Sequence, residues 1–245
     1  MSTNQPSASA VRVMVIMAHP DDAEFSCAGT VARYAAAGAY VEYVLATSGN
    51  RGSHDPTMTP EKLAAIREAE QLAAAEVLGV ANVTFLRHND GEVEPSIALR
   101  RELAHVLRKG RPDIVFTFDP WQHYQVHPDH RAIGQSTLDA VADARMPMYY
   151  PEQINGEVQA HRVRDVYFFA TEHPNHWVDI TETIDKKIAA LHCHVSQVGD
   201  RDKDQFEQFI RARARTVGQE QGMLYAEAFK HLPMTQPTPP GPKAS

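Results

Sequence analysis

Two short segments rich in histidine and aspartate could carry chemistry in this chain. Residues 19–22 read His-Pro-Asp-Asp, and residues 127–130 read His-Pro-Asp-His. In both segments the first and last residues are potential metal ligands three positions apart. That spacing brings two side chains to one side of a turn or of the first turn of a helix. Converging imidazole and carboxylate groups can bind a metal ion or move protons.

We expect His19, Asp22 and His130 to form one metal site. Two imidazoles, one carboxylate and open positions describe a catalytic Zn²⁺ centre. The same donors suit non-haem Fe²⁺, so ligand type leaves the identity of the metal open. A single His-x-x-His pair is a weak signal, but two such clusters strengthen each other if both follow neighbouring strands. With three protein ligands, a bound water would have its pKa lowered to about 7.

The other polar residues of the two segments suit proton transfer. Asp21, beside the metal, could take the proton of the water. His127, when protonated, could stabilise an oxyanion and protonate a leaving amine, and Asp129 could orient His127. The simpler alternative is that Asp21 or Asp22 only caps the following helix, which explains neither the histidine nor the second aspartate.

The predicted elements place both segments at the same edge of a sheet. Strands are expected at residues 11–18, 40–47, 83–86 and 113–118, and helices at 24–38, 60–78, 96–109 and 128–144. Alternating strands and helices with short connections predict a parallel sheet with helices on both faces. In open sheets of this kind, ligands bind beyond the carboxyl ends of the strands. Residues 19–22 and 127–130 follow the first and the last of these strands.

The second part of the chain is less regular. A strand is expected at residues 165–170, and helices at 181–194 and 202–217. We expect a disordered N-terminus at residues 1–10, one α/β domain at 11–231 and a proline-rich, disordered tail at 232–245.

Composition excludes several classes of protein. The 245 residues carry 24 Lys and Arg against 31 Asp and Glu, a net charge of −7, which argues against nucleic-acid or anionic-membrane partners. Two cysteines cannot form a disulfide framework or a four-cysteine zinc site. Residues 1–10 lack the order of a signal peptide, and the longest apolar run, residues 13–18, is too short to span a bilayer. We therefore expect a cytoplasmic protein without membrane contact.

The chain resembles the LmbE-like, PIG-L-type zinc de-N-acetylases. The resemblance rests on residues 18–24 (AHPDDAE) with residues 127–130 downstream, and it extends over roughly residues 11–229. Supporting matches are Arg67-Glu68, Leu78-Gly79-Val80, Asp90-Gly91 and His194-Val195-Ser196-Gln197. Some members have Glu directly after the aspartate pair, whereas Ala23 intervenes here and the acid is Glu24. This one-residue offset bears on which subgroup of the family the chain resembles more than on whether it is a deacetylase.

The resemblance implies a Rossmann-like fold and hydrolysis of an acetamide on a sugar. It implies that His19, Asp22 and His130 bind zinc and that Asp21 is the general base. It implies further that His127 stabilises the oxyanion or acts as the general acid. Substrates in the family are N-acetylglucosaminyl conjugates of inositol, malate or phosphatidylinositol. Many members form oligomers, so the resemblance allows a homo-oligomer.

Candidate substrate contacts come from four further residues. By the same resemblance, Arg67 and Asp90 would contact the substrate, with Asp90 accepting hydrogen bonds from sugar hydroxyls. Alternatively, Arg67 is a solvated partner of Glu70 on its helix. Asn50 and Arg51 follow the second strand, where they line the cleft or form an ordinary turn.

The predicted function is removal of the acetyl group from an N-acetylglucosamine-type substrate by zinc-activated water. An amidase with the same metal site could instead act on a thiol conjugate or an acylated antibiotic sugar. A metal-dependent phosphoesterase would need more oxygen ligands and a second metal. A Mg²⁺-binding α/β module without catalysis is disfavoured by His19 and His130, because Mg²⁺ prefers oxygen ligands.

Overall fold

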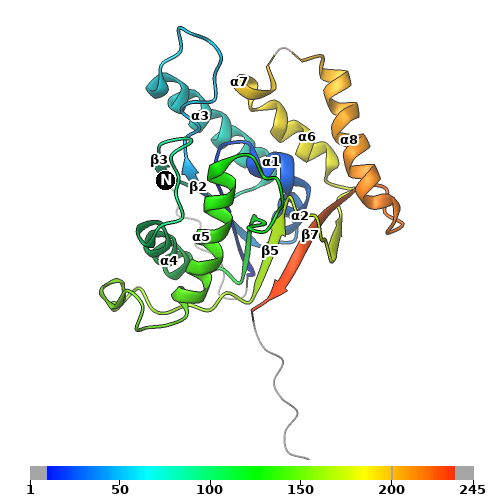
Figure 1. Cartoon of the computed structure of the whole chain (residues 1–245). Helices are drawn as coiled ribbons and strands as arrows, with labels where there is room; N and C mark the ends of the chain where they lie inside the picture. The colour runs from blue at the N-terminus through cyan, green and yellow to red at the C-terminus, as the bar shows by residue number, and fades with distance from the viewer. Residues whose placement is uncertain (1–9, 200, 235–245) are drawn as a thin grey trace, which may run out of the picture.

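The computed structural model describes residues 10–199 and 201–234, which form one α/β domain around a seven-stranded sheet (Figure 1). The expected disorder of residues 1–9 and 235–245 lies outside the described residues. The strands are β1 (Arg12–Met17), β2 (Tyr40–Thr47), β3 (Asn82–His88), β4 (Ile114–Phe118), β5 (Asp165–Phe169), β6 (His176–Asp179) and β7 (Ala226–Pro233). The α-helices are α1 (Asp22–Ser26), α2 (Ala28–Ala36), α3 (Pro60–Leu78), α4 (Ile97–Gly110), α5 (Pro128–Ala144), α6 (Ile184–His192), α7 (Val195–Val198) and α8 (Lys203–Gln219), and Pro151–Gln153 forms a short 3₁₀ helix, η1.

The sheet is parallel except at one edge. Its strand order is β3-β2-β1-β4-β5-β7-β6. The first five strands in this order pair in parallel, and β7 pairs antiparallel with both β5 and β6. The chain moves from β1 toward β3 in one direction and then returns past β1 to β4. The order therefore reverses between β1 and β4, and in open sheets of this kind ligands bind at the carboxyl ends of the strands that flank such a reversal.

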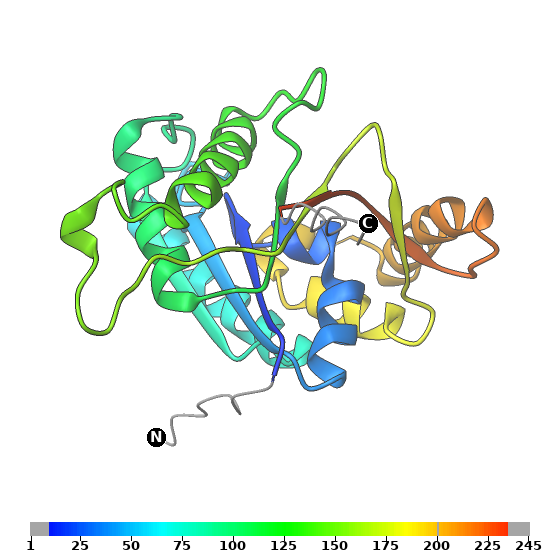
Figure 2. The ribbon, with the colours of Figure 1, turned by 90° about the horizontal axis from the view of Figure 1, so that it is seen from below.

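Helices cover both faces of the sheet. The helices α4 and α5 pack together, and α2, α3 and α6 contact one another. Because parallel crossovers are right-handed, a change of direction in strand order moves the next helix to the other face. Accordingly, α5 lies on one side of β1 and β2, and α2 and α6 lie on the other (Figure 2). None of the helices in the described ranges is long and apolar enough to cross a membrane.

Local sequence explains the elements that were predicted correctly. The hydroxyl of Thr59 accepts a hydrogen bond from the backbone N–H of Lys62 at 3.3 Å, Pro60 begins α3, and Gly79 ends it with φ +79°. These are the expected N-cap, first-turn proline and left-handed terminator. The strand β2 and the helix α5 also have the predicted bounds. The fully buried strand β4 supports the prediction of a sheet covered on both faces.

The helix predicted at residues 24–38 is in fact two helices. Cys27, with φ −141°, separates α1 from α2. Gly29 then lies so close to Ile180 that a Cβ atom would stand 2.8 Å from the isoleucine side chain. Because Ile180 comes from a distant part of the chain, the break in this helix has no local signal in the sequence.

The second part of the chain contains two strands that were not predicted, β6 and β7. Leu232 and Pro233, assigned to the tail, belong to β7 and pair with Val166 and Asp165 of β5. The helix predicted at residues 181–194 begins only at Ile184 and ends at His192, and α7 is a separate short helix. A second apolar cluster lies under these helices: Ile180, Ile184, Ile188, Leu191, Val198, Phe206, Ile210, Ala214 and Tyr225.

Candidate metal and catalytic site

The two histidine–aspartate segments meet at the carboxyl ends of β1 and β4. His19 lies two residues after the end of β1, and His130 is in the first turn of α5. The ring of Phe118, the last residue of β4, stacks on the ring of His130 with centroids 4.0 Å apart and planes inclined by 14°. The strand ends thus bring together residues more than 100 positions apart, as the predicted topology requires.

The three predicted metal ligands form a close triangle. Nδ1 of His19 lies 3.2 Å from Nε2 of His130 and 3.5 Å from a carboxylate oxygen of Asp22. The other oxygen of Asp22 lies 3.2 Å from Nε2 of His130. His19 and Asp22 are both buried. Two ring nitrogens and the two oxygens of one carboxylate thus lie within 3.5 Å of a neighbour in this set, and such donors suit a transition metal.

The second nitrogen of His19 faces two carboxylates. Its Nε2 lies 3.0 Å from Oδ2 of Asp129 and 3.1 Å from Oδ1 of Asp90. A carboxylate can only accept, so this nitrogen carries the proton. In the neutral ring, Nδ1 then has its lone pair free and directed at Asp22 and His130. This is the usual arrangement of a metal-binding histidine backed by a carboxylate.

The prediction that Asp129 orients His127 is wrong. The fully buried carboxylate of Asp129 binds His19 instead, and it also accepts hydrogen bonds from the backbone N–H groups of Gly91 at 2.8 Å and Val93 at 3.2 Å. The loop after β3 therefore fixes Asp129, and Asp129 fixes His19. Sequence spacing could not show this, because the partner lies 110 residues away.

The charges in the triangle favour a bound cation. Burial lowers the pKa of His19, but hydrogen bonds to the surrounding carboxylates, Asp129 foremost, outweigh this and raise it to about 11. Burial would raise the pKa of Asp22, but His130 and His19 hold it well below its usual range. A proton or a metal ion between these groups is therefore stabilised, and the carboxylate stays ionised.

Asp21 adopts a strained backbone beside the triangle. Its φ is +92°, in the left-handed region that non-glycine residues rarely occupy, and its side chain makes no capping hydrogen bond. The carboxylate of Asp22 instead accepts from the N–H groups of Ala18 at 3.1 Å and His19 at 2.7 Å, across the turn that precedes the helix. Simple helix capping is thus excluded as the role of either aspartate. Strain of this kind is a feature of functional sites.

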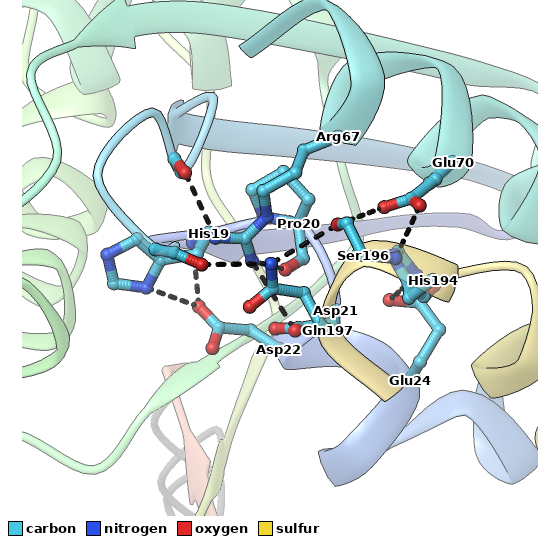
Figure 3. Close-up of polar contacts among 12 residues, drawn as sticks. His19, Pro20, Asp21, Asp22, Glu24, Arg67, Glu70, His194, Ser196 and Gln197 are labelled. Atoms are coloured by element: carbon cyan, nitrogen blue, oxygen red, sulfur yellow. Dashed lines mark hydrogen bonds and ion pairs between the residues drawn. The ribbon is translucent and has the colours of Figure 1, made fainter. Parts of the chain in front are cut away.

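The carboxyl group of Asp21 has an unusual environment. Burial raises its pKa to about 7, although the guanidinium of Arg67 opposes this rise. A carboxyl with a pKa near neutrality is suited to take up and return a proton. Nη2 of Arg67 lies 3.4 Å from Oδ2 of Asp21, which orients the carboxylate (Figure 3).

Arg67 is a buried internal residue, and its interpretation as a solvated partner of Glu70 is wrong. Only 4% of Arg67 is exposed. It donates hydrogen bonds to the carbonyl oxygens of Pro20 at 2.5 Å and Gly49 at 3.1 Å. Arg67 therefore joins α3 to the loops after β1 and β2, and no substrate is needed to explain its position.

The other predicted substrate contacts hold the loops after β2 and β3 together. Asp90 accepts from the backbone N–H of Arg51 at 3.2 Å through the oxygen that does not face His19. The side-chain oxygen of Asn50 accepts from the N–H of Asp90 at 3.0 Å. The guanidinium of Arg51 donates to the carbonyl of Asp90 and to Glu92. Both oxygens of Asp90 have partners within the chain, so little of this carboxylate is left for a sugar.

His127 lies beside His19 and His130. Its ring centroid is 4.4 Å from that of His19 and 4.7 Å from that of His130, and one of its nitrogens is close enough to theirs to share a metal ion. Its Nδ1 is buried without a hydrogen-bond partner. Burial and the neighbouring histidines lower the pKa of His127. This favours the neutral ring, whereas the predicted role as an acid requires a protonated one.

Sequence reasoning missed a set of polar residues under Asp21. Glu24, Gln71 and His194 are fully buried, and Glu24 contacts both of the others. The sequence contained a signal, since Glu24 and His194 both fall in segments that resemble the family. Nothing in their spacing shows that the first and last of them meet across 170 residues.

Comparisons with known proteins agree with this geometry. The family described as PIG-L, GlcNAc-PI de-N-acetylase, matches residues 14–141. The diacetylchitobiose deacetylase of Thermococcus kodakarensis is 33% identical over 230 residues, which cover 94% of this chain and 86% of that protein. The chain belongs to the PIG-L family.

Solved structures show the same fold. The N,N′-diacetylchitobiose deacetylase of Pyrococcus horikoshii, in complex with its inhibitor MPG, has a TM-score of 0.86 and 33% identity, over 95% of this chain and 87% of that one. GalB of Pseudomonas putida, a 4-carboxy-2-hydroxymuconate hydratase, has a TM-score of 0.77 at 24% identity, over 93% of this chain and 99% of that one. The second likeness concerns the fold alone, and a fold by itself does not decide the reaction.

Proposed function

We propose that this PIG-L protein is a metal-dependent hydrolase that removes the acetyl group from an N-acetylglucosamine-type substrate. The observation that carries the proposal is the triangle of His19, Asp22 and His130 with the strained carboxylate of Asp21 beside it. Amide hydrolysis needs an activated water, a base that takes its proton, and stabilisation of the oxyanion. The site supplies groups for each of these tasks.

The residues of the triangle fit a zinc ion. His19 would bind through Nδ1 because its Nε2 is engaged by Asp129 and Asp90, and His130 would bind through Nε2, which faces the same point. A zinc ion held there would lower the pKa of a water and polarise the amide carbonyl of the substrate. Fe²⁺ fits the same donors, so the ligands by themselves do not select the metal.

The base and the hydrogen-bond donor come from opposite sides of the triangle. Asp21 would accept the proton of the attacking water and later return it toward the leaving amine, for which its pKa of about 7 is suited. Arg67 would hold the carboxylate of Asp21 in place during these transfers. A ring N–H of His127 would donate a hydrogen bond to the oxygen of the tetrahedral intermediate.

The relatives suggest the class of substrate. Two proteins that match most of this chain are named diacetylchitobiose deacetylases, so we propose a short N-acetylglucosamine oligosaccharide as the substrate. The family also acts on N-acetylglucosaminyl inositol and malate, and these are the obvious competitors. We propose further that the protein works in the cytoplasm, without nucleic-acid or membrane partners, and that it assembles as a homo-oligomer.

A substrate panel tests this proposal. The purified protein, loaded with Zn²⁺, is incubated with N,N′-diacetylchitobiose, N-acetylglucosaminyl inositol and N-acetylglucosaminyl malate, and the release of acetate and free amine is measured. We expect one of these sugars to be deacetylated, and Asp21→Asn to lower turnover by about 10²–10⁴. Glu61→Gln, an exposed change on α3, should leave turnover unchanged. Hydrolysis of N-acetylcysteine without activity on the sugars would instead support the alternative of an amidase for thiol conjugates.

A further inference from the structure

Two fully buried ionisable residues lie under the site and have no part in the mechanism above. Glu24 is on α1, and His194 precedes α7. Nε2 of His194 lies 3.4 Å from Oε2 of Glu24. Burying a carboxylate in the protein interior is costly unless other groups compensate it. Such a pair at 0% exposure therefore calls for an explanation.

The pair connects to Asp21 through one glutamine. The amide nitrogen of Gln71 on α3 donates to Oε1 of Glu24 at 3.0 Å, and its oxygen accepts the backbone N–H of Asp21 at 3.0 Å. The amide of Gln71 is thereby held at both ends. Glu24 can only accept, so Gln71 must present its nitrogen to Glu24 and its oxygen to Asp21. The side chain of Gln71 thus links the position of Glu24 to the position of the Asp21 backbone.

The backbone of Asp21 is the part of the site that needs such support. A non-glycine residue at φ +92° persists only when its surroundings hold it there. Arg67 contacts the carboxylate of Asp21 and the carbonyl of Pro20, whereas Gln71 contacts the N–H of Asp21. The two contacts hold Asp21 at its side chain and at its backbone.

The position of His194 is itself fixed by α7. The hydroxyl and the N–H of Ser196 donate to Glu70 of α3 at 2.6 and 2.7 Å. The side-chain amide of Gln197 donates to the carbonyl of Gly52 in the loop after β2 at 3.2 Å. The start of α7 is therefore held against α3, the helix that carries Gln71.

We propose that Gln71, Glu24 and His194, which we call the positioning chain, set the direction of the Asp21 carboxylate by holding its backbone in the left-handed conformation. These are positioning residues, since they act through Asp21 and touch no substrate. The inference rests on the proposed function, because it assumes that Asp21 is the base.

A charge swap tests the direction of the hydrogen bonds. Gln71→Glu keeps the acceptor for the N–H of Asp21, but it places a second carboxylate against Glu24. We expect kcat to fall about tenfold to a hundredfold, with KM and metal content unchanged, because a small misplacement of a catalytic group has this cost. Adding Glu24→Gln restores a donor between positions 24 and 71. The double variant should recover most of the lost kcat.

A second background separates positioning from general structural damage. If the positioning chain acts through Asp21, Gln71→Glu should have no further effect on kcat in an Asp21→Asn protein. An equal loss in both backgrounds, or no rescue by Glu24→Gln, would overturn the inference and leave the proposed function standing. Full activity of Asp21→Asn would overturn both, because Asp21 would not be the base.

A measurement that does not depend on activity completes the test. Gln71→Met removes both hydrogen bonds without adding charge, and it serves if Gln71→Glu does not fold. We expect faster hydrogen–deuterium exchange in the peptide covering residues 18–26, with little change in the rest of the sheet. His192→Gln is the matched control, since His192 contacts Glu207 on α8 and lies outside the positioning chain. Unchanged exchange at residues 18–26 in Gln71→Met would contradict the proposal.

Discussion

His19 uses its two ring nitrogens for different purposes. Nδ1 faces the other members of the triangle, and Nε2 faces Asp129 and Asp90. That His19, Asp22 and His130 lie together could be predicted from the sequence, because each half of the triangle is a local motif of four residues. The carboxylates behind His19 could not be assigned correctly, since Asp129 at the start of α5 and Asp90 in the loop after β3 approach His19 only after the sheet has formed.

The contact between Asp129 and His19 gives a prediction for a single residue. Asp129→Asn keeps one acceptor oxygen but loses the charge that orients His19 and makes it more basic. We expect the affinity for Zn²⁺ to fall about tenfold to a hundredfold. Competition with a chromophoric chelator measures this change. The control is Glu92→Gln, an exposed change in the loop after β3, and equal affinities for the two variants would show that Asp129 does not support His19.

Among the helices and strands, α5 is the element whose packing positions part of the site. Gly134 lies so close to β4 that a Cβ atom would stand 2.7 Å from the carbonyl oxygen of Phe118. The ring of Phe118 stacks on His130, which is four residues earlier on α5. The close packing of α5 on β4 therefore determines where His130, a proposed metal ligand, lies.

Gly134→Ala tests this connection. In an ordinary helix the change would stabilise the protein by up to about 1 kcal/mol. Here the helix must move away from β4, so we expect lower stability to urea and weaker binding of Zn²⁺ together. Gly156→Ala is the control, since its Cβ would meet no atom within 4 Å. A more stable Gly134→Ala protein with unchanged affinity would contradict this account of the packing.

Another contact between elements is the buried ion pair of Lys187 and Glu227. It joins α6 to β7 at 2.6 Å, and Glu227 also accepts the N–H groups of Gly29 at 3.0 Å and Thr30 at 2.8 Å at the start of α2. The side chains of Lys187 and Glu227 are 6% and 5% exposed. The strand β7 was missed because its buried glutamate interrupts the apolar pattern, and its partner lies 40 residues away.

Lys187→Met should leave Glu227 with a buried and poorly compensated charge. We expect the free energy of unfolding to fall by about 3–5 kcal/mol, as measured by urea denaturation. The exposed neighbour Lys186 provides the control through Lys186→Met. A loss below about 1 kcal/mol would mean that the pair contributes little to the junction between α6 and β7.

At the scale of the whole molecule, the alternation of strands and helices correctly predicts the sheet and the edge at which the site forms. The antiparallel strands at the other edge were not predicted, because they are short and their partners lie far away in the sequence. The fold by itself does not decide the chemistry, since GalB, a hydratase, shares it. The chemistry of this protein therefore depends on what the triangle binds at the point between β1 and β4 where the strand order reverses.

The most direct test is the metal content of the purified protein, measured by mass spectrometry after reconstitution and desalting. Wild type, Asp22→Ala and Asp21→Asn are compared side by side. We predict about one zinc ion per chain in wild type and in Asp21→Asn, and its loss in Asp22→Ala. Absence of zinc and iron from wild type after reconstitution, or loss of the metal with Asp21 instead of Asp22, would contradict the central claim.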